Sequence, residues 1–145
     1  MFLGTYEHSL DEKGRLVMPR KFRDQLEAGC VITKGQEDCL YVWPPDAWER
    51  EYARVSSLPT TDRRARKFSR SFFAGAVDVQ LDKQGRIQIP EKLRVFAGMG
   101  KDTTVVGSGP RIEVWSTEVW ESEEAQADEY YSGIEEVLGL GGGEL

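Results

Sequence analysis

Two short segments place an aspartate four residues before an arginine, with a glycine directly before the arginine. The first is DEKGR at residues 11–15 and the second is DKQGR at residues 82–86. The guanidinium fork of arginine matches both a phosphate group and the O6/N7 edge of guanine. A carboxylate four residues away can orient that fork instead of neutralising it. The two turns therefore predict two equivalent contact points, and we expect both to face double-stranded DNA.

One such turn alone is better explained as an ordinary surface ion pair. An exposed Asp–Arg pair contributes only about 0–1 kcal/mol. The second copy changes that balance, because two pseudo-symmetric turns hold Arg15 and Arg86 at a fixed separation. We expect each turn to be the tip of a hairpin within its own half, and a two-stranded ribbon is narrow enough to enter the major groove.

Further basic side chains lie on the turns or just after them, and we expect them to contact phosphates. Such contacts position a protein on DNA without reading its sequence. Each lysine or arginine taken singly is also explained by solubility, which leaves that alternative open. The predicted DNA-binding residues are Asp11, Lys13, Arg15, Arg20, Lys21, Arg23, Asp82, Lys83, Arg86, Lys92 and Arg94.

Local patterns predict the elements that position the first turn. Gly14 can adopt the positive φ that closes a tight turn, and Asp11 can accept bonds from backbone N–H groups two and three residues on. Thr61 or Asp62 can cap a later helix that Gly75 ends. The predicted strands of this half are 5–10, 16–18, 30–33 and 40–43, and its helices are 20–27, one opened by 44–46 and stopped by Pro59, and 63–73.

The pattern of strand, turn, strand and helix occurs twice along the chain. The second copy follows the first at an offset of 71 residues, which becomes 72 after one inserted residue. Tryptophans recur at matching places, which favours packing in a core or a subunit interface over base stacking. These tryptophans are Trp43, Trp48, Trp115 and Trp120.

Each half has only about 45 residues, too few to bury a good core alone. We therefore expect an α+β fold in which both halves form one pseudo-symmetric unit. The predicted divisions are a first module at 5–47, a linker with a basic helix at 48–75, a second module at 76–119, and an acidic helical tail with a flexible end at 120–145.

The formal net charge of −6 conceals an uneven distribution. Nine acidic residues and no lysine or arginine follow Thr117, so residues 1–117 carry 19 basic against 16 acidic side chains, a net of +3. A mildly basic body with an acidic tail differs from a uniformly acidic protein. The basic helix at 63–70 can contact the DNA backbone or pair with the acidic tail of its own or a neighbouring chain, and the charges favour the tail.

Other functional classes find little support in the sequence. No apolar run approaches the roughly 20 residues of a membrane helix, and the N-terminus lacks the pattern of a secretory signal. Cys30 and Cys39 have no further cysteine or histidine nearby, so we expect reduced cytosolic thiols and no metal site. His8 is the single histidine, and its neighbour Ser9 points to the opposite face of the predicted strand. We therefore expect no catalytic site, no cofactor and no small-molecule substrate.

The duplicated turn, the strand and proline after it, and the stretch RxxRKFxRxFFxGA at 63–76 together resemble the MraZ family of bacterial proteins. The N-terminal pattern FxGxY at 2–6 fits as well, and the resemblance covers residues 1–138. It implies two tandem swapped-hairpin, SpoVT/AbrB-like β-α-β modules. These would intertwine into one pseudo-twofold, β-barrel-like unit with flanking helices, and the chains would assemble into a closed ring homo-oligomer.

The resemblance further implies a transcriptional regulator in the cytoplasm and on the nucleoid. It would act at the promoter of the division and cell wall gene cluster, including its own gene, and bind tandem operator repeats. Family members use the Asp-x-x-x-Arg turn for DNA, which maps onto residues 11–15 and 82–86. Gln84 stands where the first turn has Lys13, so we expect the first turn to carry more of the binding.

Functions of a different class stay open. The net charge of −6 favours a ring-forming structural or protein-interaction scaffold, in which the turns bind a protein partner. An antitoxin-like regulator is a weaker alternative, because such proteins resemble single modules and this chain is duplicated. Retention on immobilised DNA at low salt separates a DNA-binding protein from a scaffold.

Overall fold

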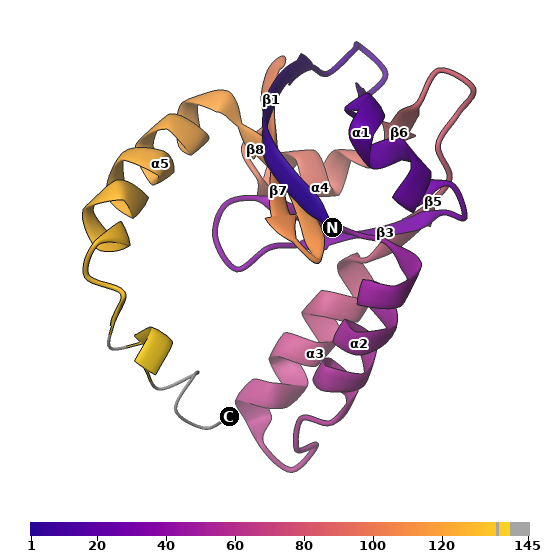
Figure 1. The fold of residues 1–145 in the computed structure, drawn as a ribbon. Helices are drawn as coiled ribbons and strands as arrows, with labels where there is room; N and C mark the ends of the chain where they lie inside the picture. Colours follow the sequence, from indigo (N-terminus) through magenta and orange to yellow (C-terminus); the bar gives the residue numbers. More distant parts are fainter. Residues whose placement is uncertain (136, 140–145) are drawn as a thin grey trace.

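The computed structural model describes residues 1–135 and 137–139 and shows a mixed α+β fold, as the sequence predicts (Figure 1). The strands are β1 (Phe2–Ser9), β2 (Arg15–Val17), β3 (Cys30–Lys34), β4 (Leu40–Trp43), β5 (Val77–Val79), β6 (Arg86–Gln88), β7 (Asp102–Gly109) and β8 (Arg111–Ser116). The helices are α1 (Arg20–Arg23), the 3-10 turn η1 (Asp24–Leu26), α2 (Pro45–Ser56), α3 (Arg63–Gly75), α4 (Glu91–Phe96) and α5 (Thr117–Tyr131). The order of elements in the first half recurs in the second.

The two halves share their sheets instead of forming one sheet each. A six-stranded antiparallel sheet has the order β1-β7-β8-β4-β3-β5, and a separate two-stranded sheet pairs β2 with β6. Strands of different halves are therefore hydrogen-bonded at β1–β7, at β4–β8, at β3–β5 and at β2–β6. Because each half completes the sheet of the other, they fold as one unit, as their small size led us to expect.

The main hydrophobic core lies between the two sheets and the short helices. Leu16 and Ile87 pair opposite each other at the centre of β2 and β6, and both are fully buried. Met18 and Ile89, the residues just before the prolines of α1 and α4, are fully buried as well. The apolar positions of both strand–proline motifs thus anchor the turns that precede them.

A second cluster explains the recurring tryptophans. Trp43 and Trp115 are buried together with Tyr41, while Trp48 stacks on Phe72 at a ring-centroid distance of 5.9 Å. Their rings join α2, α3 and α5 to the large sheet. The prediction that the tryptophans serve packing is confirmed for Trp43 and Trp115, whereas Trp48 and Trp120 are half-buried and pack against the same cluster.

Several predicted boundaries shift in the structure. The helix expected at 20–27 is one turn of α-helix followed by the 3-10 turn η1, where the Glu27 N–H bonds to Asp24 O three residues back. Such tightening is common at helix ends. The cap of α3 is Asp62 rather than Thr61, since its carboxylate accepts bonds from Arg64 N at 2.7 Å and Ala65 N at 3.0 Å. The acidic helix, expected at 118–138 with an interruption at Gly133, runs as α5 to Tyr131; a turn at 132–134 contains Gly133, and residues 135 and 137–139 are helical again. The expected flexible end at 139–145 lies outside the described residues from 140 onward.

The basic and acidic helices lie apart. In Figure 1, α2 and α3 form a helical hairpin at the end of the molecule away from both turns, and α5 extends on another side. Within the described part of the chain, no ion pair joins α3 to α5. Pairing within one chain, one of the two predicted tail contacts, is therefore not made by these residues.

None of the helices in the described ranges has the length and apolar character needed to cross a bilayer.

Candidate nucleic-acid interface

The first turn is a closed hydrogen-bonded unit built on Asp11. One carboxylate oxygen accepts bonds from the backbone N–H groups of Lys13 and Arg15, both at 2.9 Å. The other accepts from Arg15 Nε at 2.6 Å. Gly14 has a φ of 77° and donates its N–H to Asp11 O at 3.0 Å. The side-chain bonds therefore run two and four residues forward, and the expected bond three residues on is made by the backbone carbonyl instead.

The second turn repeats this geometry around Asp82. Its carboxylate accepts from the N–H groups of Gln84 and Arg86 at 2.9 Å, and from Arg86 Nε at 2.7 Å. Gly85 has a φ of 76° and donates to Asp82 O at 3.0 Å. The duplicated sequence thus specifies the same local structure twice.

Both carboxylates are held in the ionised state. Hydrogen bonding from the Arg15 backbone N–H is the main reason that the pKa of Asp11 lies below its ordinary value. The Arg86 backbone N–H lowers the pKa of Asp82 in the same way. A hydrogen bond to the charged form favours that form. Each aspartate therefore stays charged at neutral pH and orients its arginine, while the remaining guanidinium nitrogens stay available as donors.

The two turns are not separate hairpins but the two ends of one antiparallel ribbon. The first half contributes β2 and the second contributes β6, paired so that Arg15 lies opposite Gln88 and Arg86 opposite Val17. Within the first half, β1 and β2 are joined only by the bridge between Leu10 and Leu16. The hairpin expected within each half therefore extends no further than its tip, and the main partner of β2 comes from the other half.

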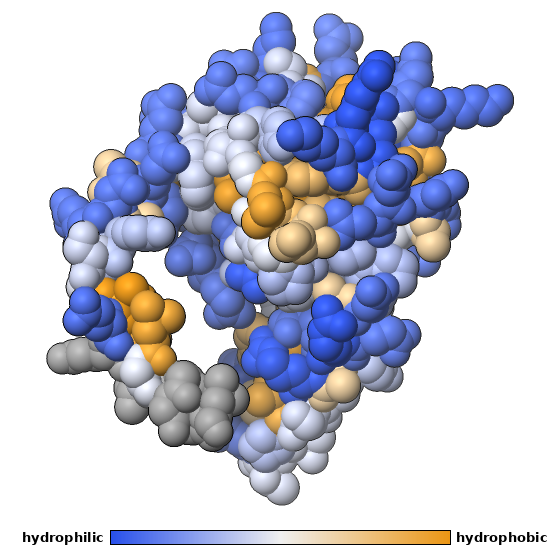
Figure 2. Space-filling model, in the orientation of Figure 1, coloured by the Kyte–Doolittle hydropathy of each residue, from blue (hydrophilic) through white to orange (hydrophobic). Residues whose placement is uncertain are grey.

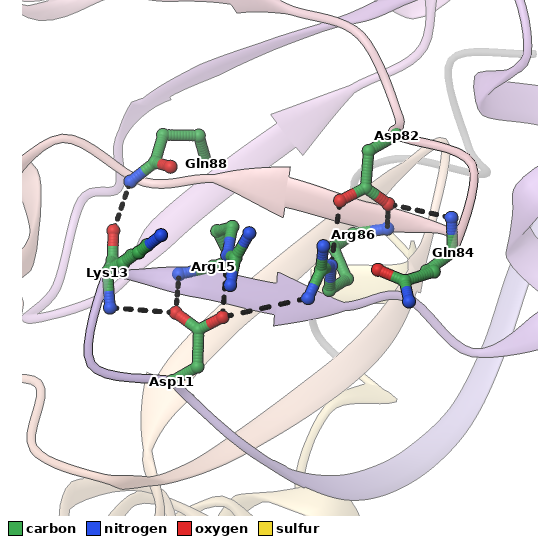
Figure 3. A network of polar contacts seen from close by, with 7 residues as sticks. All are labelled: Asp11, Lys13, Arg15, Asp82, Gln84, Arg86 and Gln88. Carbon is green, nitrogen blue, oxygen red and sulfur yellow. Dashed lines mark hydrogen bonds and ion pairs between the residues drawn. The ribbon is translucent and has the colours of Figure 1, made fainter.

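Backbone bonds at its ends lengthen the ribbon. Met18 N donates to Gly85 O at 2.8 Å, and Ile89 N donates to Gly14 O at 2.9 Å. The glycine of each turn thus accepts a bond from the opposite half. Figure 3 shows Arg15 and Arg86 side by side on this ribbon, with an aspartate at either end. The structure therefore brings both aspartates and both arginines of the turns into one network.

Two contacts of this network have no counterpart. The Nη1 atom of Arg86 lies 3.9 Å from a carboxylate oxygen of Asp11, whereas no ion pair in the described chain joins Arg15 to Asp82 (Figure 3). Gln88 Nε2 donates to the carbonyl of Lys13. The residue equivalent to Gln88 in the first half is Val17, whose side chain has no donor. Sequence reasoning missed Gln88, and the only signal was this difference between the copies.

Most of the other predicted residues are exposed around the ribbon. Figure 2 shows hydrophilic side chains projecting from the end of the molecule that carries the turns. The exposed basic residues on the turns and on α1 and α4 are Lys13, Lys83, Arg20, Lys21 and Lys92. Arg23 and Arg94 differ, because they are half-buried and their Nε atoms donate to Met18 O and Ile89 O, each at 3.0 Å.

The groups considered for other chemistry lie in ordinary structural environments. Cys30 and Cys39 are free and buried, and burial raises the pKa of each thiol to about 12. His8 lies in β1, where burial, with a smaller effect of Arg23, lowers its pKa. Among residues 1–135 and 137–139, no group of three His, Cys, Asp or Glu side chains is placed to hold a metal ion.

Comparison with known families gives one match over nearly the whole chain. A family model described as "MraZ protein, putative antitoxin-like" matches residues 1–71 and again residues 72–136. Each match contains one Asp-x-x-x-Arg turn and the strand, proline and helix that follow it. The repeated domain organisation inferred from the sequence is thereby confirmed.

Proposed function

The chain belongs to the MraZ family, a family of regulator type, and on that premise we propose that it is a sequence-specific DNA-binding regulator of transcription. The β2–β6 ribbon would enter the major groove, where Arg15 and Arg86 would contact guanine edges or phosphates. The single observation that carries this proposal is the network of Figure 3. It fixes two partly exposed arginines side by side on the ribbon, each oriented by an ionised aspartate.

The remaining predicted residues would position the protein on the duplex. Exposed lysines and arginines on the turns and the following helices suit contacts with phosphates, which carry no sequence information. They are Lys13, Lys83, Arg20, Lys21 and Lys92. We propose two SpoVT/AbrB-like modules of swapped-hairpin type at 5–47 and 76–119. The exchange of strands between the halves supports this description.

A closed ring of chains would carry several ribbons. Tandem operator repeats about one helical turn apart, roughly 10 bp, would place successive ribbons on one face of the DNA. Each contact could then be weak while the assembly binds well. We place this activity in the cytoplasm and on the nucleoid, at the promoter of the division and cell wall gene cluster that includes the protein's own gene.

We propose that α3 and α5 of neighbouring chains contribute to the ring. The exposed face of α3 carries five cations between Arg63 and Arg70, whereas α5 carries six carboxylates and no cation. The helix α3 lies away from the turns, so DNA bound at the ribbon would not reach it (Figure 1). A contact between unlike surfaces of two copies is the kind that closes into a ring.

Truncation after Glu121 tests this contact. The shortened chain should form a smaller assembly in light scattering, or bind non-specific DNA more tightly because the acidic tail is gone. The variant Lys67→Glu, which weakens the same contact from α3, should shift the assembly in the same direction. If assembly size and non-specific binding are both unchanged, the tail is only a solubilising appendage.

The test of DNA binding uses a fluorescent duplex from upstream of the protein's own gene and a scrambled duplex of equal composition. We expect tighter binding to the native duplex, a footprint that repeats about every 10 bp, and affinity that falls steeply with salt as counterions are released. Arg15→Ala should remove the preference for the native duplex and leave the oligomer intact. An unchanged preference in that variant would show that the ribbon does not read the DNA.

A scaffold that binds other proteins is the second candidate. The net charge of −6 and the antitoxin-like description of the family favour it. A chain that is not retained on immobilised DNA at low salt, yet still assembles, would support this alternative over the regulator.

A further inference from the structure

Arg94, in the second half of the chain, lies against the first turn. A Cβ atom built on Gly14 would lie 2.9 Å from both Nε and Cζ of Arg94, closer than real Cβ atoms approach other atoms. The φ of 77° favours glycine at this position, and the guanidinium of Arg94 packs against its Cα. The arginine that covers the turn is 80 residues away in the sequence.

Arg23, in the first half, lies against the second turn in the same way. A Cβ atom on Gly85 would lie 2.5 Å from Cζ of Arg23, and the φ of Gly85 is 76°. Since Arg23 and Arg94 are equivalent residues of the two copies, one contact repeats the other. Each half supplies the arginine that covers the turn of its partner half.

Two hydrogen bonds connect each of these arginines to the glycine that it covers. Gly14 O accepts from Ile89 N at 2.9 Å, and Ile89 O accepts from Arg94 Nε at 3.0 Å, which brings the guanidinium back over Gly14. At the second turn, Gly85 O accepts from Met18 N at 2.8 Å, and Met18 O accepts from Arg23 Nε at 3.0 Å. The same side chain thus binds the end of its own strand and covers the opposite turn.

From these contacts we infer that Arg23 and Arg94 are positioning residues that hold the turn of the opposite half, rather than phosphate contacts. Lysine cannot replace them, because the interaction needs a donor at Nε and a flat group at Cζ. Removing Arg94 should therefore loosen the turn that carries Arg15, and removing Arg23 the turn that carries Arg86. The consequence for DNA rests on the proposed function, but the coupling between the halves does not.

Hydrogen exchange in the protein without DNA is the first test. Arg94→Lys keeps the charge, and we expect about tenfold faster exchange at Gly14, Arg15 and Ile89, with no change at Gly85 and Arg86. Arg23→Lys should give the reverse pattern. Lys92→Ala, an exposed neighbour of Arg94 on α4, is the matched control and should change neither turn.

If neither variant changes amide hydrogen exchange at either turn, the inference is wrong. It is also wrong if each variant loosens the turn of its own half instead of the opposite one. Because two equivalent variants are measured, a variant that fails to fold does not remove the test. Circular dichroism identifies such a variant.

DNA binding supplies a second, separate readout. A positioning residue should lower the preference for the native duplex while the dependence of log affinity on log salt stays the same. In Arg94→Ala, which removes the charge, a lost phosphate contact should instead reduce that slope by about 1. A reduced slope with normal exchange would assign Arg94 to the phosphates. If the protein binds no DNA at all, the proposed function fails, while the exchange result still decides the positioning role.

Discussion

The two Asp-x-x-x-Arg turns have the same internal structure but different surroundings. Each aspartate accepts the same set of bonds, and the Nε distances are 2.6 Å in the first turn and 2.7 Å in the second. Outside this set, Asp11 also lies 3.9 Å from Arg86, and Gln88 binds the carbonyl of Lys13. The second turn has neither contact.

This comparison shows where a duplicated motif can diverge. The residues that build the turn keep their types, because the bonds to the aspartate and the positive φ of the glycine constrain them. Positions whose side chains do not hold the turn together differ between the copies, namely Glu12 against Lys83, Lys13 against Gln84 and Gln88 against Val17. As a result only the first turn has a lysine at its third position and a bond from Gln88, and its aspartate lies near two arginines.

Loss of each arginine is expected to have the largest effect. One good bidentate base contact is worth about 1–3 kcal/mol, so Arg15→Ala should weaken binding to the native duplex by roughly 10- to 100-fold. Arg86→Ala should weaken it less, because the second turn has Gln84 at the position where the first turn has Lys13. Anisotropy titrations at one salt concentration measure both. Equal losses would mean that the turns contribute equally, despite their different surroundings.

Loss of each aspartate should have the next largest effect on specific DNA affinity, and the effect should differ between the two turns. Asp11→Asn releases Arg15 and weakens the contact with Arg86, whereas Asp82→Asn affects Arg86 alone. Exposed ion pairs are individually weak, so we expect losses of about fivefold and about twofold in specific affinity. The order of the two variants is the decisive result. A larger loss for Asp82→Asn would show that the contact between Asp11 and Arg86 has no role on DNA.

Substitutions at the third residue of each turn should change how steeply DNA binding depends on salt. Gln84→Lys gives the second turn the lysine of the first, and each additional phosphate contact should steepen the salt dependence by about 0.9. Lys13→Gln is the matched opposite and should flatten the slope by a similar amount. The slopes come from titrations at several salt concentrations. A slope that does not move with Lys13→Gln would place this lysine away from the phosphates.

Loss of the hydrogen bond from Gln88 to the Lys13 carbonyl is expected to have the smallest effect on DNA binding. Gln88→Val removes the bond to the Lys13 carbonyl and makes position 88 equal to its counterpart at 17. We expect roughly twofold weaker specific binding, since a neutral hydrogen bond contributes about 0.5–1.5 kcal/mol and this one is exposed. Val17→Gln tests whether the second turn gains from the same donor. If Gln88→Val leaves amide hydrogen exchange at Lys13 unchanged, the hydrogen bond from Gln88 does not stabilise the first turn.

Much of this molecule could be predicted from particular residues. The φ values of Gly14 and Gly85, the cap at Asp62 and the burial of Trp43 and Trp115 all follow from local chemistry or from repetition. The residue pattern alone did not predict the partner of β2, because three residues of alternating pattern pair equally well with a strand of either half, and only the family resemblance implied that the halves intertwine. The contact made by Gln88 could not be predicted from the pattern either, because Gln88 lies opposite Arg15 only when β2 pairs with β6.

The sequence by itself determined the repeat, the α+β elements, the shape of each turn and the membership in the MraZ family. These depend on interactions between residues close in the chain or on residue types that can be compared directly. Only the tertiary structure decided that the two turns form one ribbon, that Asp11 serves two arginines, and that Arg94 and Arg23 each cover the opposite turn. Those contacts join residues 62 to 80 positions apart, and they form because neither half can bury its apolar face without the other.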